Sequence, residues 1–546
     1  MGFYSAFIVA DRVELTTRRA GLAADEAVRW SSDGRGQYTL EAAERPTRGT
    51  TIVLHLRDDD RDLLSGYRLR AIIGKYSDHI SLPIVMPAEK RGEGAGPAAK
   101  GGEGTEEAAE EDTVNQASAL WTRPKNEIGE ADYTEFYRHI TSDYADPLSW
   151  VHSKIEGTYE YTLLLFIPSH APYDLWLIDS ARGIRLHVRR IFIMEDSSGQ
   201  LMPRYLRFIR GVIDSADLPL NVSRELLQGS RVVDRIRSSA VKKVLQLLKD
   251  MAEKEPDKYA TFTKEFGAVL KEGIVEDLAN RDETARLVRF TTTQGEDVPL
   301  ADYVARMKEG QEKVYYLLAP TLAAARSSPH LEAFRAKGIE VLLLADVVDN
   351  WLVTSLREFE GKQLQSVAQG AADLGGLADE ADRAAQDQAS TELAGLLARL
   401  KELLDGQAWD VRVSSRLTTS PACIVANEPT SEINLVQRLR GSGLPSQPVL
   451  EINPKHPLVE RLNRRPDDPR LADWASVLFN QAVLTSGARI DDPAAFVTRL
   501  NDLLTALTEE EGAGEEEAGE EEAGETASDR REVDADDGGA AAADHG

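Results

Sequence analysis

An arginine at the start of an expected helix is the first feature of this sequence with an obvious chemical use. In DLPLNVSRELLQ, residues 217–228, Ser223 suits an N-cap position, which makes Arg224 the first helical residue. A cation at that end of the helix dipole loses on the order of 0.3–1 kcal/mol. Either a salt bridge to a neighbouring carboxylate offsets this loss, or the guanidinium binds an anion from another part of the molecule. Gln228, one turn later, would support an anion contact.

Trp351 in DVVDNWLVTSL is the second candidate, because it follows a polar pair just beyond an expected buried strand. A tryptophan in such a position either completes the core or, when exposed, marks a binding surface. In a helical segment Trp351, Leu352 and Leu356 would share one face. That face would be surrounded by four acids, which favour basic ligands: Asp346, Asp349, Glu358 and Glu360.

The signatures of several common enzyme classes are absent from the sequence. It contains no GxxxxGK[ST], no GxGxxG opening a helix, no HExxH and no GxSxG. The nine histidines are scattered and Cys423 is the single cysteine, so we expect no metal site and no intrachain disulfide. In SPACIV, Cys423 fits a small buried hydrophobic position. This cysteine usage indicates a reducing cytoplasm.

The charge of the chain disfavours general binding to nucleic acids and to anionic membranes. Sixty-four Lys and Arg residues against 92 Asp and Glu residues give a formal charge of -28 over 546 residues, which repels phosphate and anionic lipid. Half of the imbalance lies in residues 509–546, where sixteen acids face only Arg530 and Arg531. The longest apolar segment is interrupted by polar residues and prolines, so we expect no membrane span and no signal peptide.

Two acidic stretches of low complexity divide the chain into blocks. They contain GEGAGPAAKGGEGTEEAAEED and EEEAGEEEAGE, and neither buries enough apolar surface to offset the entropy of ordering. They predict a flexible linker at 88–118 and a disordered tail at 509–546. The remaining blocks are 1–87, 119–380 and 381–508.

Hydrophobic periodicity predicts a mixture of strands and helices in the first two blocks, which indicates an α/β protein. Expected strands and helices lie at 51–56 (half-buried strand), 63–76 (helix), 159–168 and 183–194 (strands), 232–251 (helix) and 338–344 (buried strand). The first block has too few residues for a large core of its own, so it resembles a piece of a larger domain.

The third block ends in an amphipathic helix. Asp492 and Pro493 form a good N-cap and first position, and the apolar stripe that follows includes Phe496, Leu500 and Leu507. A stripe this wide near a chain end either packs on its own domain or pairs two subunits.

Several long motifs give the chain a family resemblance. DLPLNVSRELLQ, preceded by RYLRFIRGVIDSA, closely resembles the middle-domain motif of the bacterial HtpG chaperones in the ninety-kilodalton heat-shock family. Further similar motifs follow the family order: GFYSAFIVADRV, RGTTIVLHLRDD, LWTRPKNEI, EFYRHITSDYADPLSWVHSKIEGTYEYTLLLFIPSHAPYDLW, LHVRRIFIM, KGIEVLLL and LEINPKHPLVERL. Together they cover nearly the whole expected folded chain.

The resemblance implies a multidomain α/β fold and a chaperone function. It assigns 1–87 to the C-terminal part of an α/β-sandwich nucleotide domain of the GHKL ATPase type, 119–380 to an α/β middle domain, and 381–508 to a mainly helical dimerisation domain. The implied function is that of a cytoplasmic homodimer that binds unfolded or partly folded client proteins and uses ATP with magnesium.

The same resemblance implies roles for individual residues. Arg224 would reach the γ-phosphate of ATP, with Gln228 as its polar companion. Gly2 and Phe3 would belong to the phosphate-side loop, and Thr50 in RGTT would lie near the adenine. Client binding would use Trp351, Leu352 and Leu356. The dimer interface would contain Trp474, Leu478, Phe496, Leu500, Leu503 and Leu507.

The chain departs from the family at its start. Family members carry a segment before GFYSAF with the catalytic Glu, the magnesium-linked Asn and the adenine-binding Asp, and this sequence begins at MGFYSAF. We therefore expect the chain alone to bind ATP poorly and not to hydrolyse it. A gene model begun too late or a truncated gene would explain the difference. The alternative function is a nucleotide-inert dimeric module that binds clients.

Overall fold

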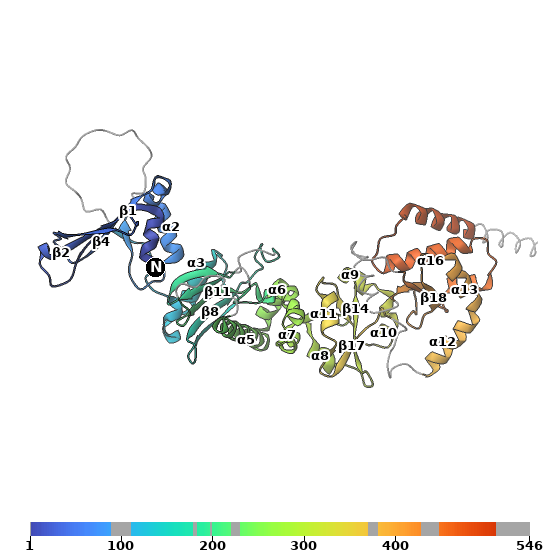
Figure 1. Ribbon diagram of the computed structural model, residues 1–546. Helices are drawn as coiled ribbons and strands as arrows, with labels where there is room; N and C mark the ends of the chain where they lie inside the picture. The colour runs from blue at the N-terminus through green and yellow to red at the C-terminus, as the bar shows by residue number, and fades with distance from the viewer. Residues whose placement is uncertain are drawn as a thin grey trace, which may run out of the picture. The chain divides into compact units, whose positions relative to one another are not determined.

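The computed structural model describes residues 2–88, 111–177, 183–196, 199–219, 230–369, 380–426 and 447–508. The chain forms two compact units, one comprising Met1–Pro203 and Arg207–Val244, the other Arg204–Leu206 and Leu245–Gly546. Figure 1 labels their helices and strands. The described residues contain five β-sheets together with many helices. The architecture is therefore mixed α/β, as the sequence predicts.

The first sheet of unit 1 is antiparallel, with strand order β3-β2-β1-β4. Its elements are η1 (Gly2–Ser5), α1 (Ala6–Val9), β1 (Ala10–Arg18), η2 (Ala24–Glu26), β2 (Ala27–Ser32), β3 (Tyr38–Ala43), β4 (Gly49–Leu56), η3 (Asp58–Leu64) and α2 (Gly66–Tyr76). The predicted strand at 51–56 and most of the predicted helix at 63–76 are confirmed. The half-buried character expected of the strand is wrong, because every residue of β4 except the last is exposed.

A small two-stranded sheet joins the two sides of the acidic stretch. β5 (Val85–Pro87) pairs antiparallel with β6 (Glu111–Thr113), so that Pro87 lies opposite Glu111. Two residues after the end of β6, the buried Asn115 accepts a hydrogen bond from the backbone N–H of Ile84 at 2.8 Å. The same side chain donates to the carbonyl of Leu82 at 3.0 Å. Residues 111–118 therefore carry defined contacts, although the sequence assigns them to a flexible linker.

The central sheet of unit 1 has strand order β10-β9-β11-β8-β7. Its elements are η4 (Leu120–Thr122), η5 (Lys125–Glu127), α3 (Glu130–Thr141), β7 (Ser149–Ile155), β8 (Tyr161–Ile167), β9 (Ile184–Val188), β10 (Ile191–Glu195) and β11 (Arg210–Ser215). Every residue of β8 is buried, which explains its continuous apolar run. A side chain at Gly211 would place its Cβ 2.1 Å from the carbonyl oxygen of Leu164, so only glycine fits there.

α5 (Arg231–Lys254) covers the predicted helix at 232–251 and continues from unit 1 into unit 2. Unit 2 also contains η6 (Arg204–Leu206), α6 (Pro256–Glu276) and α7 (Arg281–Leu287). A mixed sheet follows with order β13-β12-β15-β14-β17-β16. Its strands are β12 (Arg289–Thr292), β13 (Val298–Pro299), β14 (Lys313–Leu318), β15 (Leu342–Leu344), β16 (Glu358–Phe359) and β17 (Lys362–Ser366). Its helices are α8 (Leu300–Ala305), α9 (Leu322–Arg326), η7 (Pro329–Leu331), α10 (Glu332–Ala336) and α11 (Asp349–Ser355).

The last module of unit 2 packs helices on a sheet of order β18-β20-β19. Its elements are α12 (Glu380–Glu392), α13 (Ala394–Leu403), β18 (Asp410–Val413), β19 (Ala422–Val425), β20 (Val449–Ile452), α15 (Pro457–Arg464), α16 (Leu471–Thr485) and a helix at 493–508. The predicted N-cap is confirmed, because Asp492 Oδ1 accepts a hydrogen bond from the backbone N–H of Ala495 at 2.9 Å.

Candidate functional site

Trp351 is the one predicted client-binding side chain that reaches the surface. It lies in α11 and is 52% exposed, whereas Leu352 and Leu356 are 1% and 2% exposed. The expectation of a shared surface face is therefore wrong, because the two leucines turn into the core. Val347, one turn earlier in sequence, is also exposed at 61%. Apolar exposure at this site consequently comes from Trp351 and Val347.

A buried ion pair fixes the start of α11. Lys271 on α6 places its Nζ 2.9 Å from Asp349 Oδ1 and 2.8 Å from Asp346 Oδ2. The other carboxylate oxygen of Asp349 accepts the backbone N–H of Asp346 at 2.9 Å. Burial alone would lower the pKa of Lys271, but the two carboxylates overcome this effect and raise it. Lys271 therefore stays charged, and α11 has a rigid attachment to α6.

The predicted acidic surround of Trp351 is partly neutralised. Asp349 is fully buried against Lys271, and Asp346 is paired with the same lysine. Glu360 lies 3.6 Å from Arg286, while Glu358 is exposed. The acids that the sequence places around the tryptophan are thus largely engaged in the fold, and they do not form a simple negative rim.

A cavity of about 670 Å³ with a mixed polar and apolar lining lies beside the same ion pair. Lys271 and Asp346 contribute to its wall, and Phe290 lies below the ammonium group with 5.1 Å between Nζ and the ring centroid. The charged part of the lining also contains Lys264, Arg289, Glu296 and Asp297. The cavity therefore offers both signs of charge beside apolar side chains such as Phe290, Leu322 and Leu343.

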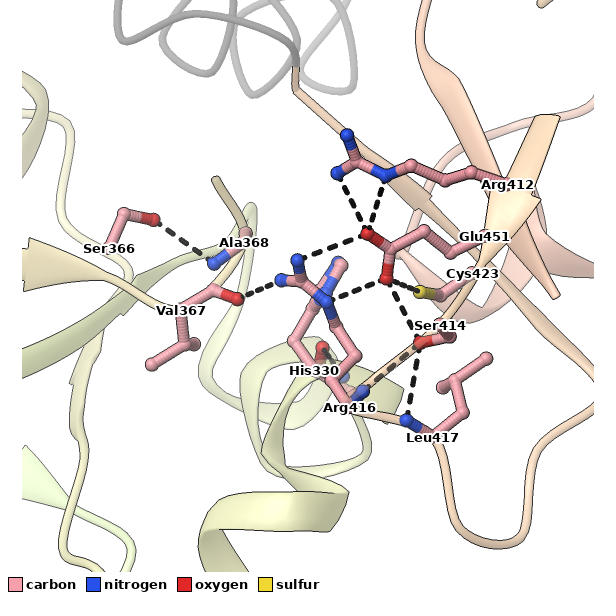
Figure 2. Close-up of polar contacts among 11 residues, drawn as sticks. His330, Ser366, Val367, Ala368, Arg412, Ser414, Arg416, Leu417, Cys423 and Glu451 are labelled. Carbon is pink, nitrogen blue, oxygen red and sulfur yellow. Dashed lines mark hydrogen bonds and ion pairs between the residues drawn. The ribbon is translucent and has the colours of Figure 1, made fainter. Parts of the chain in front are cut away.

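A second buried charge network lies in the last module and was not predicted. Figure 2 shows Arg416 between Glu451 and the carbonyl of Val367. Arg412 donates to Glu451 Oε1 from Nη2 at 2.8 Å, and Ser414 donates to Oε2 at 2.9 Å. The side chain of Arg416 is completely buried, although SSRLTTSPACIV gives no periodic signal that its arginine lies inside. The network ties the end of β17 to β18 and β20.

Comparison with known proteins relates the chain to one family over most of its length. The Hsp90 protein family model matches residues 93–537. The Chaperone protein HtpG of Nitrosospira multiformis is 53% identical over 522 residues, which cover 94% of this chain and 80% of the relative. That of Chromobacterium violaceum is 54% identical over 515 residues, covering 93% of this chain and 80% of the relative.

The chain belongs to the Hsp90 family of HtpG chaperones. The resemblance drawn from the motifs is thereby confirmed. Arg224 and Gln228, which the motif singles out in this HtpG-family chain, lie outside the described residues, so their roles stay predictions.

The residues assigned to the nucleotide have protein partners of their own in this HtpG-family chain. Gly2 begins η1, and the ring of Phe3 meets Trp30 edge to face with 5.7 Å between centroids. The hydroxyl of Thr50 shares a hydrogen bond with that of Thr17 at 2.9 Å. These contacts do not present a set of donors for a triphosphate. These three residues alone do not form a triphosphate site, and their assignment to the nucleotide stays a prediction.

The predicted dimer residues pack mainly inside their own module. Trp474, Leu478 and Leu503 are 7%, 0% and 1% exposed and belong to one hydrophobic core. Phe496, Leu500 and Leu507 are partly buried against it. The apolar side chains that remain exposed on these helices are Leu484, Val497 and Leu504. The stripe predicted from sequence therefore packs largely within its own module, and its part in dimerisation stays a prediction.

The described part of the HtpG-family chain contains neither a metal-binding cluster nor a membrane-spanning helix. No group of three or more His, Cys, Asp or Glu residues there has the arrangement of a metal site. None of its helices combines the length and apolar character needed to cross a bilayer.

Proposed function

We propose that this HtpG-family chain holds unfolded or partly folded client proteins at a surface centred on Trp351. The observation that carries the proposal is an indole 52% exposed on a helix whose neighbouring leucines are buried. Lys271, Asp346 and Asp349 keep that helix rigid. A rigid exposed aromatic group contacts many different apolar segments at small entropic cost.

The proposed assembly is a homodimer formed through the last module, 381–508. Leu484, Val497 and Leu504 supply exposed apolar surface there, and each fully buried leucine would contribute about 1.5–3 kcal/mol. The blocks 1–87 and 119–380 would act as the nucleotide-domain part and the middle domain of the family's ATP-driven cycle. In that cycle Arg224 and Gln228 would contact the nucleotide phosphate, for which a guanidinium is well suited.

Aggregation suppression by the full chain tests the client surface. Trp351→Ala should weaken protection of a heat-unfolded test enzyme several-fold and leave the melting temperature within about 1 °C, because the indole contributes little to the core. Trp409→Ala is the matched control, since Trp409 is 62% exposed in the same unit. Equal protection by both variants would remove Trp351 from the proposed site, as would early melting with retained protection.

A nucleotide-independent holding function is the second candidate. It is favoured by the engagement of Phe3 and Thr50 with protein partners. The chain should then protect the test enzyme equally with and without magnesium and ATP, and should release no phosphate above background. Phosphate release that disappears in Arg224→Ala would favour the ATP-driven cycle instead.

A further inference from the structure

An arginine-lined groove lies where the described chain ends. The groove holds about 470 Å³ and lies between the loop that joins α15 to α16 and the helix at 493–508. Its charged wall contains four arginines: Arg461, Arg464, Arg465 and Arg470. Its apolar wall includes Trp474 and Leu507. Such a combination of guanidinium groups and an apolar floor favours an anionic chain segment.

The lining of the groove contains more arginines than carboxylates. Asp467 and Asp468 also line it, which leaves an excess of two positive charges from four arginines and two aspartates. Asp468 accepts the backbone N–H of Arg470 at 2.8 Å, so one of its oxygens serves the turn. Arg464 is 76% exposed and paired only with the exposed Glu460, one helical turn away. Within the described part of the chain, the guanidinium of Arg470 makes no hydrogen bond or ion pair.

The sequence that follows the groove is its electrostatic opposite. Leu507 lines the groove, and EEEGAGEEEAGEEEAGE begins two residues later at 509. Residues 509–525 contain ten glutamates and no basic residue. We propose that this acidic segment, 509–525, docks in the arginine-lined groove of its own chain. Its carboxylates face the guanidinium groups, so the module covers its own basic surface.

The acidic segment is attached next to the groove, so even a weak attraction is sufficient for docking. A segment tethered this closely has an effective concentration in the millimolar range, and each residue adds at most about 3.6 Å of reach. The charges are exposed, so the contact depends on salt: the screening length falls from about 8 Å at physiological ionic strength to about 3 Å at 1 M. The docked segment therefore leaves the groove at high salt, whereas an apolar contact would persist.

Fluorescence anisotropy of the full chain tests this contact. A dye attached to Ala513→Cys reports the segment selectively, because Cys423 is buried. The anisotropy should be high at low salt and fall at least twofold at 1 M salt. The triple variant Arg464→Gln, Arg465→Gln, Arg470→Gln should show the low value already at low salt. Replacement of all ten glutamates of 509–525 by glutamine should have the same effect.

A matched variant separates a specific groove from overall charge. Arg326→Gln, Arg399→Gln, Arg489→Gln removes the same number of exposed arginines from the same unit and should retain the high anisotropy. Equal loss in both triple variants, or no loss in either, would overturn the proposal. Energy transfer between chains labelled separately with donor at 513 and acceptor at Asp467→Cys would place the segment in a second copy and overturn the assignment to its own chain.

Discussion

Arg416 donates from Nε to Glu451 Oε2 across 2.8 Å, and both side chains are buried. The carboxylate also receives Arg412 and Ser414, and Arg416 reaches the carbonyl of Val367 (Figure 2). Both carboxylate oxygens of Glu451 and all three guanidinium nitrogens of Arg416 thus have partners of opposite polarity. Two parts of unit 2 that lie far apart in sequence are joined through it.

Removing Arg416 should destabilise unit 2 strongly. Arg416→Met leaves the Glu451 carboxylate buried with only part of its compensation, and we expect a loss of about 3–5 kcal/mol in the free energy of unfolding. Denaturant unfolding measures this loss. Arg399→Met is the control, because Arg399 pairs with Glu402 at the surface and should cost less than about 1 kcal/mol. A double variant, Arg416→Met with Glu451→Met, that loses as much as Arg416→Met alone would contradict the charge argument.

Cys423 should be unreactive in the folded chain. Its thiol is completely buried, and burial together with Glu451 raises its pKa well above the usual value, so little thiolate forms at neutral pH. A thiol reagent should modify the native chain orders of magnitude more slowly than the denatured chain. Modification that is fast in the native chain and independent of denaturant would show that the β19 region opens readily.

Acid should destabilise unit 1 through His187. Burial, assisted by His79, lowers the pKa of His187 from 6.5 to about 3. Below about pH 6.5 His187 is therefore protonated in the unfolded chain but neutral in the folded chain. The free energy of unfolding consequently decreases as the pH falls from 6.5 toward 3. One such group contributes at most about 1.4 kcal/mol per pH unit.

The replacement His187→Phe should flatten this acid dependence while keeping a ring beside Trp121, whose centroid is 5.0 Å away. Amide exchange in β9 and β11, measured at pH 7, 6 and 5, reports the stability of this part of unit 1. Parallel pH profiles for the native chain and His187→Phe would mean that His187 does not titrate on unfolding.

Gly211 should tolerate no side chain. Its φ of +142° and the 2.1 Å approach of a Cβ to Leu164 O combine backbone strain with overpacking, so Gly211→Ala should cost about 2–6 kcal/mol. Gly74→Ala in α2 is the matched control, because that site has no atom within 4 Å of the added Cβ. It should stabilise the chain by up to about 1 kcal/mol. Thermal melting distinguishes the two results.

Local signals in the sequence were sufficient for many elements. Asp492 and Pro493 specify a helix start through the cap alone, and the unbroken apolar run of β8 marks a central strand. The family could also be identified from the sequence, because long motifs occur in the family order along the chain. The cap and the apolar run depend on residues close together in sequence, and the family assignment depends on the order of whole motifs.

Contacts between residues far apart in the sequence could not be predicted in the same way. Lys271 meets Asp349 across 78 positions, and this pairing removes an acid from the expected surround of Trp351. The expectation grouped Leu352 and Leu356 with Trp351 on one face, but Leu352 of α11 and Leu356 just after it are buried in the core. Burial of Arg416 likewise depends on a carboxylate 35 positions away. Hydrophobic periodicity predicts which face of a helix is more apolar, but tertiary packing determines which side chains are exposed to solvent.

The pairing of Pro87 with Glu111 makes neighbours of the two described ends of the acidic stretch. Its length is consequently uncoupled from the geometry of the fold on either side. Doubling such a loop costs only about 0.6 kcal/mol in closure entropy. The segment between β5 and β6 is therefore a permissive place for evolution to expand or contract the chain. It is also a natural insertion point for a reporter domain whose own termini lie close together.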